Sequence, residues 1–106
     1  MKIILVEVGK EPYVTNIPHT LENMQKVVGG YIQAVYPWQD RDPVALVCNE
    51  EGILMGLPIN RMLSDTDGIV GNFFLCGLGD EDFEDMPEKL IDKYLDMFRL
   101  RGGQKT

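Results

Sequence analysis

The segment NEEGILMGLPINR, residues 49–61, holds amide, carboxylate and guanidinium side chains around a short apolar run. Turn formation accounts for its glycines and its proline, but it does not account for Asn49, Asn60 and Arg61. In one interpretation, Arg61 pairs across a hairpin with one of the two glutamates that follow Asn49. In the other, the three residues line a small polar pocket that binds an anion or a carboxylate, because a guanidinium matches the geometry of a carboxylate.

Acidic side chains are concentrated in residues 80–98, which hold eight acids and two lysines. This segment therefore carries most of the net charge of −7. Such a surface repels the phosphates of nucleic acids, so we expect no direct nucleic-acid binding; it either binds a basic protein partner or keeps the chain soluble. The candidate partner-binding residues are Asp80, Glu81, Asp82, Glu84 and Asp85.

Side chains that could support metal or catalytic chemistry occur without the required spacing. Residues 64–68, SDTDG, resemble the start of a calcium loop, but Cys76 occupies the position that needs a glutamate. His19 is the single histidine, and both Cys48 and Cys76 lie in apolar segments where we expect buried free thiols. The sequence has no phosphate-binding loop, Gly-x-Ser-x-Gly motif or pair of metal-binding histidines. We therefore expect no catalytic residue, no metal and no cofactor.

Trp38 is the only tryptophan, and it lies at the end of a predicted strand beside the polar turn QDRDP. It has two possible roles at such a place. It covers the edge of the core, or it is exposed and anchors a protein partner, since tryptophan is enriched among residues that dominate binding energy.

The elements that position these side chains follow from the hydrophobic pattern. Short apolar runs predict strands at residues 2–8, 12–17, 31–38, 44–48, 53–56 and 69–78, the last with a bulge at Gly71. Residues 20–30 predict a helix that begins at Thr20 as N-cap and ends at Gly29 or Gly30.

Two further helical segments are predicted in the second half of the chain. Residues 57–63, LPINRML, predict a helical turn that begins with a proline. A longer amphipathic helix follows Asp85, which forms a capping box with Glu88, and it ends at Gly102. The fold class is α+β: a mixed, largely antiparallel sheet of five to six strands with two α-helices.

Three of the predicted strands, residues 3–8, 44–48 and 73–78, are apolar on both faces. A sheet of this size is about 20–25 Å wide, and one helix covers about 10 Å. Two helices therefore cover little more than one face. Either the sheet curls on itself, or its second face meets another copy or another protein, which is the outcome we expect.

Length and composition indicate one soluble domain over residues 1–106, with a loosely ordered tail at about 102–106. The chain has no apolar segment long enough to span a bilayer, and Glu7 interrupts the signal-like start. We expect a cytoplasmic protein that does not act at a membrane.

Three segments carry a family resemblance: LENMQKVVGGYIQAVYP, LVCNEEGILMGLPINRML and GIVGNFFLCGLG. In order and spacing they resemble the family named domain of unknown function 3846, from residue 1 to about residue 80. The resemblance implies no catalytic residues. It implies small proteins or modules of bacteria, phages and mobile elements. Such modules resemble accessory cargo that is sometimes found near anti-restriction or other anti-defence genes, which implies a non-enzymatic interaction role.

The predicted function is a small non-enzymatic module that binds a protein partner or forms a homo-oligomer. It acts by stoichiometric contact through the acidic surface or the uncovered sheet face, and the resemblance implies an accessory or anti-defence role. The alternative is a small-molecule or anion-binding domain that uses Asn49, Asn60 and Arg61. The third hypothesis is that the chain is an enzyme, which would require a reactive cysteine.

Overall fold

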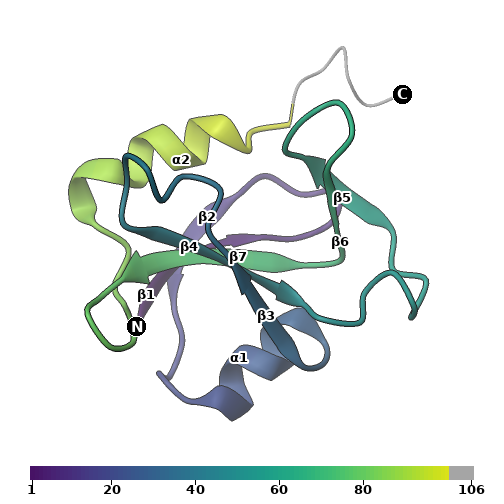
Figure 1. The fold of residues 1–106 in the computed structure, drawn as a ribbon, viewed down its shortest axis with the longest axis horizontal. Coiled ribbons are helices and arrows are strands. Elements are labelled where there is room, and N and C mark those ends of the chain that lie inside the picture. The colour runs from purple at the N-terminus through teal and green to yellow at the C-terminus, as the bar shows by residue number, and fades with distance from the viewer. Residues whose placement is uncertain (101–106) are drawn as a thin grey trace.

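One antiparallel sheet forms the centre of the molecule in the computed structural model, which describes residues 1–100 (Figure 1). Its strand order is β2-β1-β7-β4-β3, and β8 pairs with β7. The strands are β1 (Lys2–Val6), β2 (Tyr13–Asn16), β3 (Ile32–Val35), β4 (Val44–Asn49), β7 (Phe73–Leu78) and β8 (Phe83–Glu84). The predicted α+β class with a largely antiparallel sheet and two helices is confirmed. The predicted helix end at Gly102 and the tail at about 102–106 lie outside the described residues.

A second, two-stranded sheet pairs β5 (Ile59–Met62) with β6 (Gly68–Val70). The predicted helical turn at 57–63 is therefore wrong, because its central residues form β5. The predicted single strand at 69–78 is also wrong. The strand is interrupted at Gly71, whose φ of 73° is strained for any residue with a side chain. The segments before and after it, β6 and β7, therefore belong to different sheets.

Helix α1 (Leu21–Val28) has the predicted ends. The Thr20 Oγ1 atom accepts a hydrogen bond from the backbone N–H of Asn23 at 3.1 Å, and Gly29 ends the helix with φ 79°. Both features are local, which is why the sequence reveals them.

Helix α2 (Ile91–Met97) follows a 3₁₀ turn, η1 (Glu88–Leu90), and is shorter than predicted. The predicted capping box is absent because β1 engages both of its acids. The Asp85 Oδ1 atom accepts a hydrogen bond from the backbone N–H of Lys2 at 2.8 Å, and Glu88 pairs with the Lys2 ammonium. These contacts join residues more than eighty positions apart, so no local pattern indicates them.

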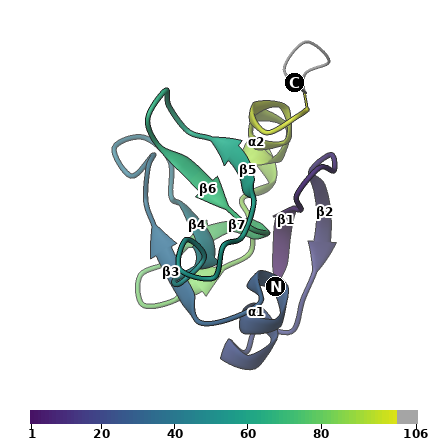
Figure 2. The same ribbon diagram turned by 90° about the vertical axis from the view of Figure 1, so that its right-hand side faces the viewer.

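The two helices lie on opposite sides of the sheet (Figure 2). Helix α1 covers the face that carries Ile3, Val47 and Phe74. Helix α2 packs against the other face, which carries Leu46 and Leu75. Both faces of the central strands are thus buried within the chain, which explains why those strands carry apolar residues on both faces. The expectation that a partner covers the second face is wrong.

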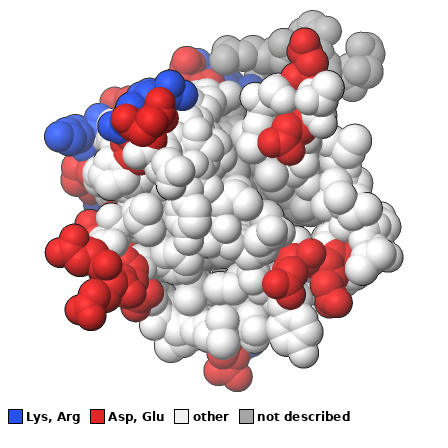
Figure 3. Space-filling view, viewed as in Figure 1, with Lys and Arg blue, Asp and Glu red and all other residues white. Residues whose placement is uncertain are grey.

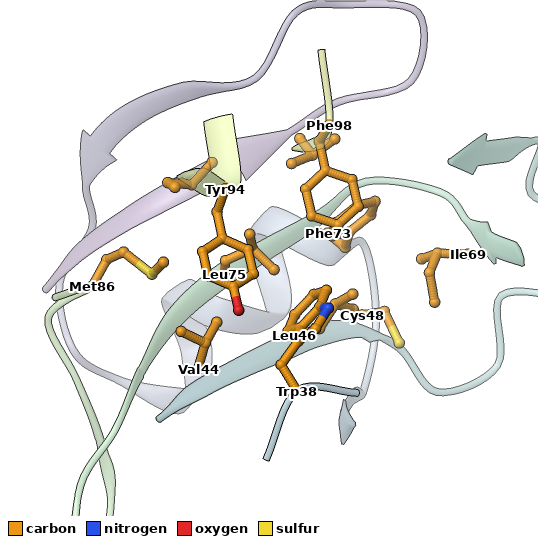
Figure 4. Close-up of a cluster of buried hydrophobic side chains, with 12 residues drawn as sticks. Trp38, Val44, Leu46, Cys48, Ile69, Phe73, Leu75, Met86, Tyr94 and Phe98 are labelled. Atoms are coloured by element: carbon orange, nitrogen blue, oxygen red, sulfur yellow. The ribbon is translucent and has the colours of Figure 1, made fainter. Parts of the chain in front are cut away.

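An aromatic cluster fills the space between α2 and the sheet (Figure 4). The ring centroids of Trp38 and Tyr94 are 4.9 Å apart, and those of Phe73 and Phe98 are 5.4 Å apart. Trp38 is only 5% exposed. Its assignment as a partner-binding anchor is therefore wrong, and its other predicted role, covering the edge of the core, is the one observed.

Candidate interaction site

Residues 50–57, between β4 and β5, form a single helical turn in place of the strand predicted at 53–56. The Met55 N–H donates to the carbonyl of Glu51 at 2.9 Å. The turn ends in a Schellman motif, in which the Gly56 N–H bonds to the Ile53 carbonyl at 3.1 Å and the Leu57 N–H to the Gly52 carbonyl at 3.0 Å. Gly56 has the positive φ, 73°, that this motif requires. The apolar run ILM is therefore part of a closed turn.

Three consecutive apolar side chains of this turn are exposed, and the Met55 sulfur also accepts a hydrogen bond from the Asn49 Nδ2 group at 3.5 Å. Ile53 is 81% exposed, Leu54 is 88% exposed and Met55 is 52% exposed. Burial of such a side chain contributes about 1.5–3 kcal/mol, and the fold gains little of that contribution here. Contiguous exposed apolar surface on a folded chain is characteristic of binding sites.

Asn49 holds the base of the turn. Its Nδ2 group donates to the Val28 carbonyl at 3.1 Å, and its Oδ1 atom accepts from the Glu51 N–H at 2.7 Å. This side chain is 5% exposed, and it links the end of α1 to the start of the turn. Asn49 is thus a structural residue of the candidate site.

Gly52 fixes the turn against β6. A Cβ atom at this position would lie 2.6 Å from the Cγ2 atom of Val70, so only glycine permits this approach. The exposed apolar residues are consequently presented on a turn that is hydrogen-bonded internally, anchored at its base and packed on a strand.

A hollow of about 270 Å³ lies between this turn, β6 and the β3–β4 side of the large sheet. Its floor includes Val35 from β3, Cys48 from β4 and Ile69 from β6. Its volume is just below the range of about 300–1,000 Å³ that is typical of small-molecule sites. A hollow of this size suits one or two side chains of a partner.

In the described part of the chain, the charged residues that line the hollow are all acidic: Glu50, Glu51 and Asp67. Figure 3 shows acidic groups on the right-hand side of the molecule, where Figure 1 places the turn, β5 and β6. On the same face, lysine and arginine gather mainly at the upper left, over α2. The hollow therefore lies in a region of negative potential.

The two cysteines are buried and free, as predicted. Burial raises the pKa of the Cys48 thiol, and burial together with the charge of Asp82 raises the pKa of Cys76 to about 12. Both side chains are therefore neutral thiols near pH 7, which is the less nucleophilic form.

Asn60 and Arg61 do not form the predicted pocket with Asn49. The Asn60 Nδ2 group donates to the carbonyls of Val6 and Gly71, at 2.8 Å and 2.9 Å. The two residues are not among those that line the hollow, whereas Asn49 is. The structure thus separates the three candidate ligand-binding residues and places Asn60 in the packing of β5 on β1.

Arg61 makes internal hydrogen bonds instead of pairing with a glutamate of the turn. Its Nε group donates to the Phe98 carbonyl at 2.8 Å, and its Nη2 group donates to the Lys10 carbonyl at 2.6 Å. Burial lowers the pKa of Arg61, while the charge of Glu11 opposes that shift. The predicted pairing with Glu50 or Glu51 is wrong, because the guanidinium donates instead to the main-chain oxygens of Phe98, just after α2, and of Lys10, between β1 and β2.

The acidic residues predicted to bind a partner surround β8, at the lower left of Figure 3, away from the turn. Asp80, Glu81 and Glu84 are exposed. The Asp82 Oδ2 atom lies 3.3 Å from the His19 Nε2 atom, and Asp85 accepts the bond from Lys2 already described. Within residues 1–100, no three histidine, cysteine or acidic side chains are arranged to hold a metal ion. Partner binding by this acidic surface remains a prediction.

Sequence reasoning missed the exposed turn because a short apolar run does not distinguish a strand from a turn. The available signal was the pair of glycines that bracket it, Gly52 and Gly56. Two glycines around three apolar residues fit a turn closed by a left-handed residue at least as well as a strand.

Comparison with known proteins identifies the family. The family described as Domain of unknown function (DUF3846) matches residues 1–99, so the chain belongs to it. No curated protein and no solved structure matches the chain. In residues 1–100, no helix has the length and apolar character needed to cross a bilayer.

Proposed function

We propose that this member of the DUF3846 family is a small non-enzymatic module that binds a protein partner through the turn at residues 50–57. The observation that carries the proposal is the exposure of Ile53, Leu54 and Met55 on a turn that is fixed before any partner arrives. A preformed surface binds without the entropy cost of ordering a loop. Three adjacent apolar side chains provide the anchors that dominate such contacts.

The state of the reactive groups supports a non-enzymatic role. Both thiols are buried with raised pKa values, so neither is activated for nucleophilic chemistry. The three polar side chains considered as ligands, Asn49, Asn60 and Arg61, donate their hydrogen bonds to groups of the chain itself. The accessory role in phages and mobile elements that the resemblance implies is part of the same proposal.

The experiment compares tagged variants as baits in a lysate of the host cell. The test variant is Ile53→Ser/Leu54→Ser, which removes the two most exposed apolar side chains of the turn. A matched control, Val14→Ser/Leu21→Ser, removes two exposed apolar side chains on β2 and α1. A charge-reversed variant, Asp80→Lys/Glu81→Lys/Asp82→Lys, tests the acidic surface separately.

We expect one stoichiometric protein on the wild type and on the matched control, and its loss from the turn variant. Equal capture by all four baits, or capture lost only on the charge-reversed variant, would contradict a contact through the turn. We expect every variant to be folded, because all the substituted side chains are exposed. Circular dichroism and thermal melting of each bait check this.

A further inference from the structure

Strand β3 is an edge of the large sheet, and one side of its backbone has no neighbouring strand among residues 1–100. The Glu50 N–H donates to the Tyr31 carbonyl, and Gln33 is paired with Cys48, so residues 31, 33 and 35 bond toward β4. By the alternation of an antiparallel ladder, the N–H and C=O groups of Ile32 and Ala34 point away from β4. Within the described part of the chain, no other segment forms hydrogen bonds with them.

The hollow lies beside this free edge. Gln33 and Val35, on the α2 side of β3, line it together with Ile53 and Leu54 of the turn. A strand that paired with β3 would place every second side chain on that same side of the sheet, next to Gln33 and Val35. The free backbone and the hollow can therefore bind one extended segment together.

The charge of the lining indicates which kind of segment fits. Among residues 1–100, the charged residues that line the hollow are Glu50, Glu51 and Asp67, with no lysine or arginine. A basic side chain on the incoming segment would pair with these acids, whereas an acidic one would be repelled. A second copy of this chain would bring the same acids together, and each copy carries a net charge of −7.

We propose that β3 and the adjacent hollow bind an extended peptide segment of a partner protein by strand addition, with an apolar side chain in the hollow and a lysine or arginine beside Glu50, Glu51 and Asp67. This inference rests on the proposed function and specifies its partner. Main-chain hydrogen bonds to Ile32 and Ala34 provide affinity, and the hollow and its acids provide specificity. The exposed turn covers the apolar side chain of the peptide once it is bound.

The test uses a displayed library of random dodecapeptides, selected on the immobilised full chain. We expect the enriched peptides to alternate an apolar residue with lysine or arginine. The strongest peptide is then measured against two variants with proline on a free edge, Ala34→Pro on β3 and Val14→Pro on β2. Proline removes an outward N–H and is tolerated on edge strands, so we expect at least about tenfold weaker binding for Ala34→Pro and an unchanged affinity for Val14→Pro.

A second measurement uses the wild-type chain alone and so does not depend on the folding of a variant. N-methylation of the peptide at alternate residues removes the N–H groups on one side of its backbone at a time. We expect one set of methyl groups to abolish binding and the other set to leave it intact, because only one side of an added strand faces β3.

Four results would overturn the inference. The first is that no peptide is enriched, and the second is that the enriched peptides are acidic. The third is that Ile53→Ser/Leu54→Ser abolishes peptide binding while Ala34→Pro and both methylated peptides leave it unchanged; the turn would then bind a partner, as proposed, without strand addition. The fourth is a concentration-dependent dimer that Ala34→Pro disrupts, which would identify a second copy as the occupant.

Discussion

Strands β2 and β3 are the two edges of the same sheet, and their backbones present the same chemistry to solvent. Each is four residues long. By the same alternation, Val14 and Asn16 direct their backbone groups outward from β2, as Ile32 and Ala34 do from β3. A free edge is therefore not by itself the feature that makes a binding site.

The surroundings of the two edges differ. Strand β3 lies beside a hollow with acidic residues and beside a fixed turn with exposed apolar side chains. Strand β2 is bracketed by Pro12 and Pro18, and the hydroxyl of its Tyr13 donates to Glu7 at 3.1 Å. The flanking prolines limit how far a strand added to β2 could extend its pairing. If β3 binds a peptide as proposed, its specificity comes from the residues that lie next to this edge.

The largest effect is expected from the core residue that supports the β3 side. Trp38 lies in the connection from β3 to β4 and packs on Tyr94 and Phe98. We expect Trp38→Ala to lower the free energy of unfolding by about 3–5 kcal/mol, because it leaves a large cavity. Urea unfolding measures the change, and Tyr36→Ala, which alters an exposed neighbour, serves as the control. A change for Trp38→Ala as small as that for the control would contradict its burial.

Arg61 supports the β2 side through the connection between β1 and β2. Arg61→Ala leaves the carbonyls of Lys10 and Phe98 without their donor, so we expect a loss of about 2–3 kcal/mol in unfolding free energy. Arg99→Ala is the matched control, since Arg99 is exposed and pairs only with Asp96 among the ion pairs described. If Arg61 were a ligand-binding residue with no structural role, Arg61→Ala would unfold at the same urea concentration as the wild type.

Asn49 is expected to have a somewhat smaller effect on stability and a direct effect on the β3 site. Asn49→Ala removes the bonds to Val28 and Glu51, and we expect a cost of about 1–3 kcal/mol. The turn loses its anchor, so the amide of Glu51 should exchange faster with solvent while the amides of β2 keep their rates. Amide exchange followed by NMR tests this. Equally faster exchange of the Glu51 amide and of the β2 amides would contradict a local role of Asn49 at the β3 site.

The smallest effect concerns pH. Asp42, in the β3–β4 connection, accepts hydrogen bonds from the Lys93 ammonium and the Tyr94 hydroxyl of α2. These bonds lower the pKa of Asp42. A carboxyl with a lowered pKa stabilises the fold above its unfolded pKa, near 3.9, and loses that contribution as the pH falls through the folded value. We therefore expect the wild type to lose stability in acid below about pH 4, and Asp42→Asn to lose less of its stability there. Unfolding curves measured across this range would contradict the assignment if the two chains lost stability in parallel.

The sequence predicted the parts of the fold that local patterns determine. The apolar runs marked β1, β4 and β7, and Thr20 and Gly29 marked both ends of α1. It failed where a distant contact decides the structure. Nothing near Arg61 indicates that main-chain oxygens of residues 10 and 98 receive its hydrogen bonds, and nothing near Asp85 indicates that β1 engages it.

The candidate site was predicted only in part for the same reason. The segment 49–61 was predicted as a site because of its polar residues. Those residues form hydrogen bonds within the fold, whereas the apolar run of the segment is exposed to solvent. Exposure depends on how the chain packs around the run. The open edge of β3 also depends on strand order, which no local pattern encodes.

Amide hydrogen exchange on the wild-type chain, free and saturated with the strongest selected peptide, tests the central claim most directly. Strand addition at β3 predicts that the amides of Ile32 and Ala34 exchange rapidly in the free chain and become protected in the complex, while those of Val14 and Asn16 on β2 do not change. Binding that protects neither Ile32 nor Ala34, or that protects the β2 amides instead, would contradict the account.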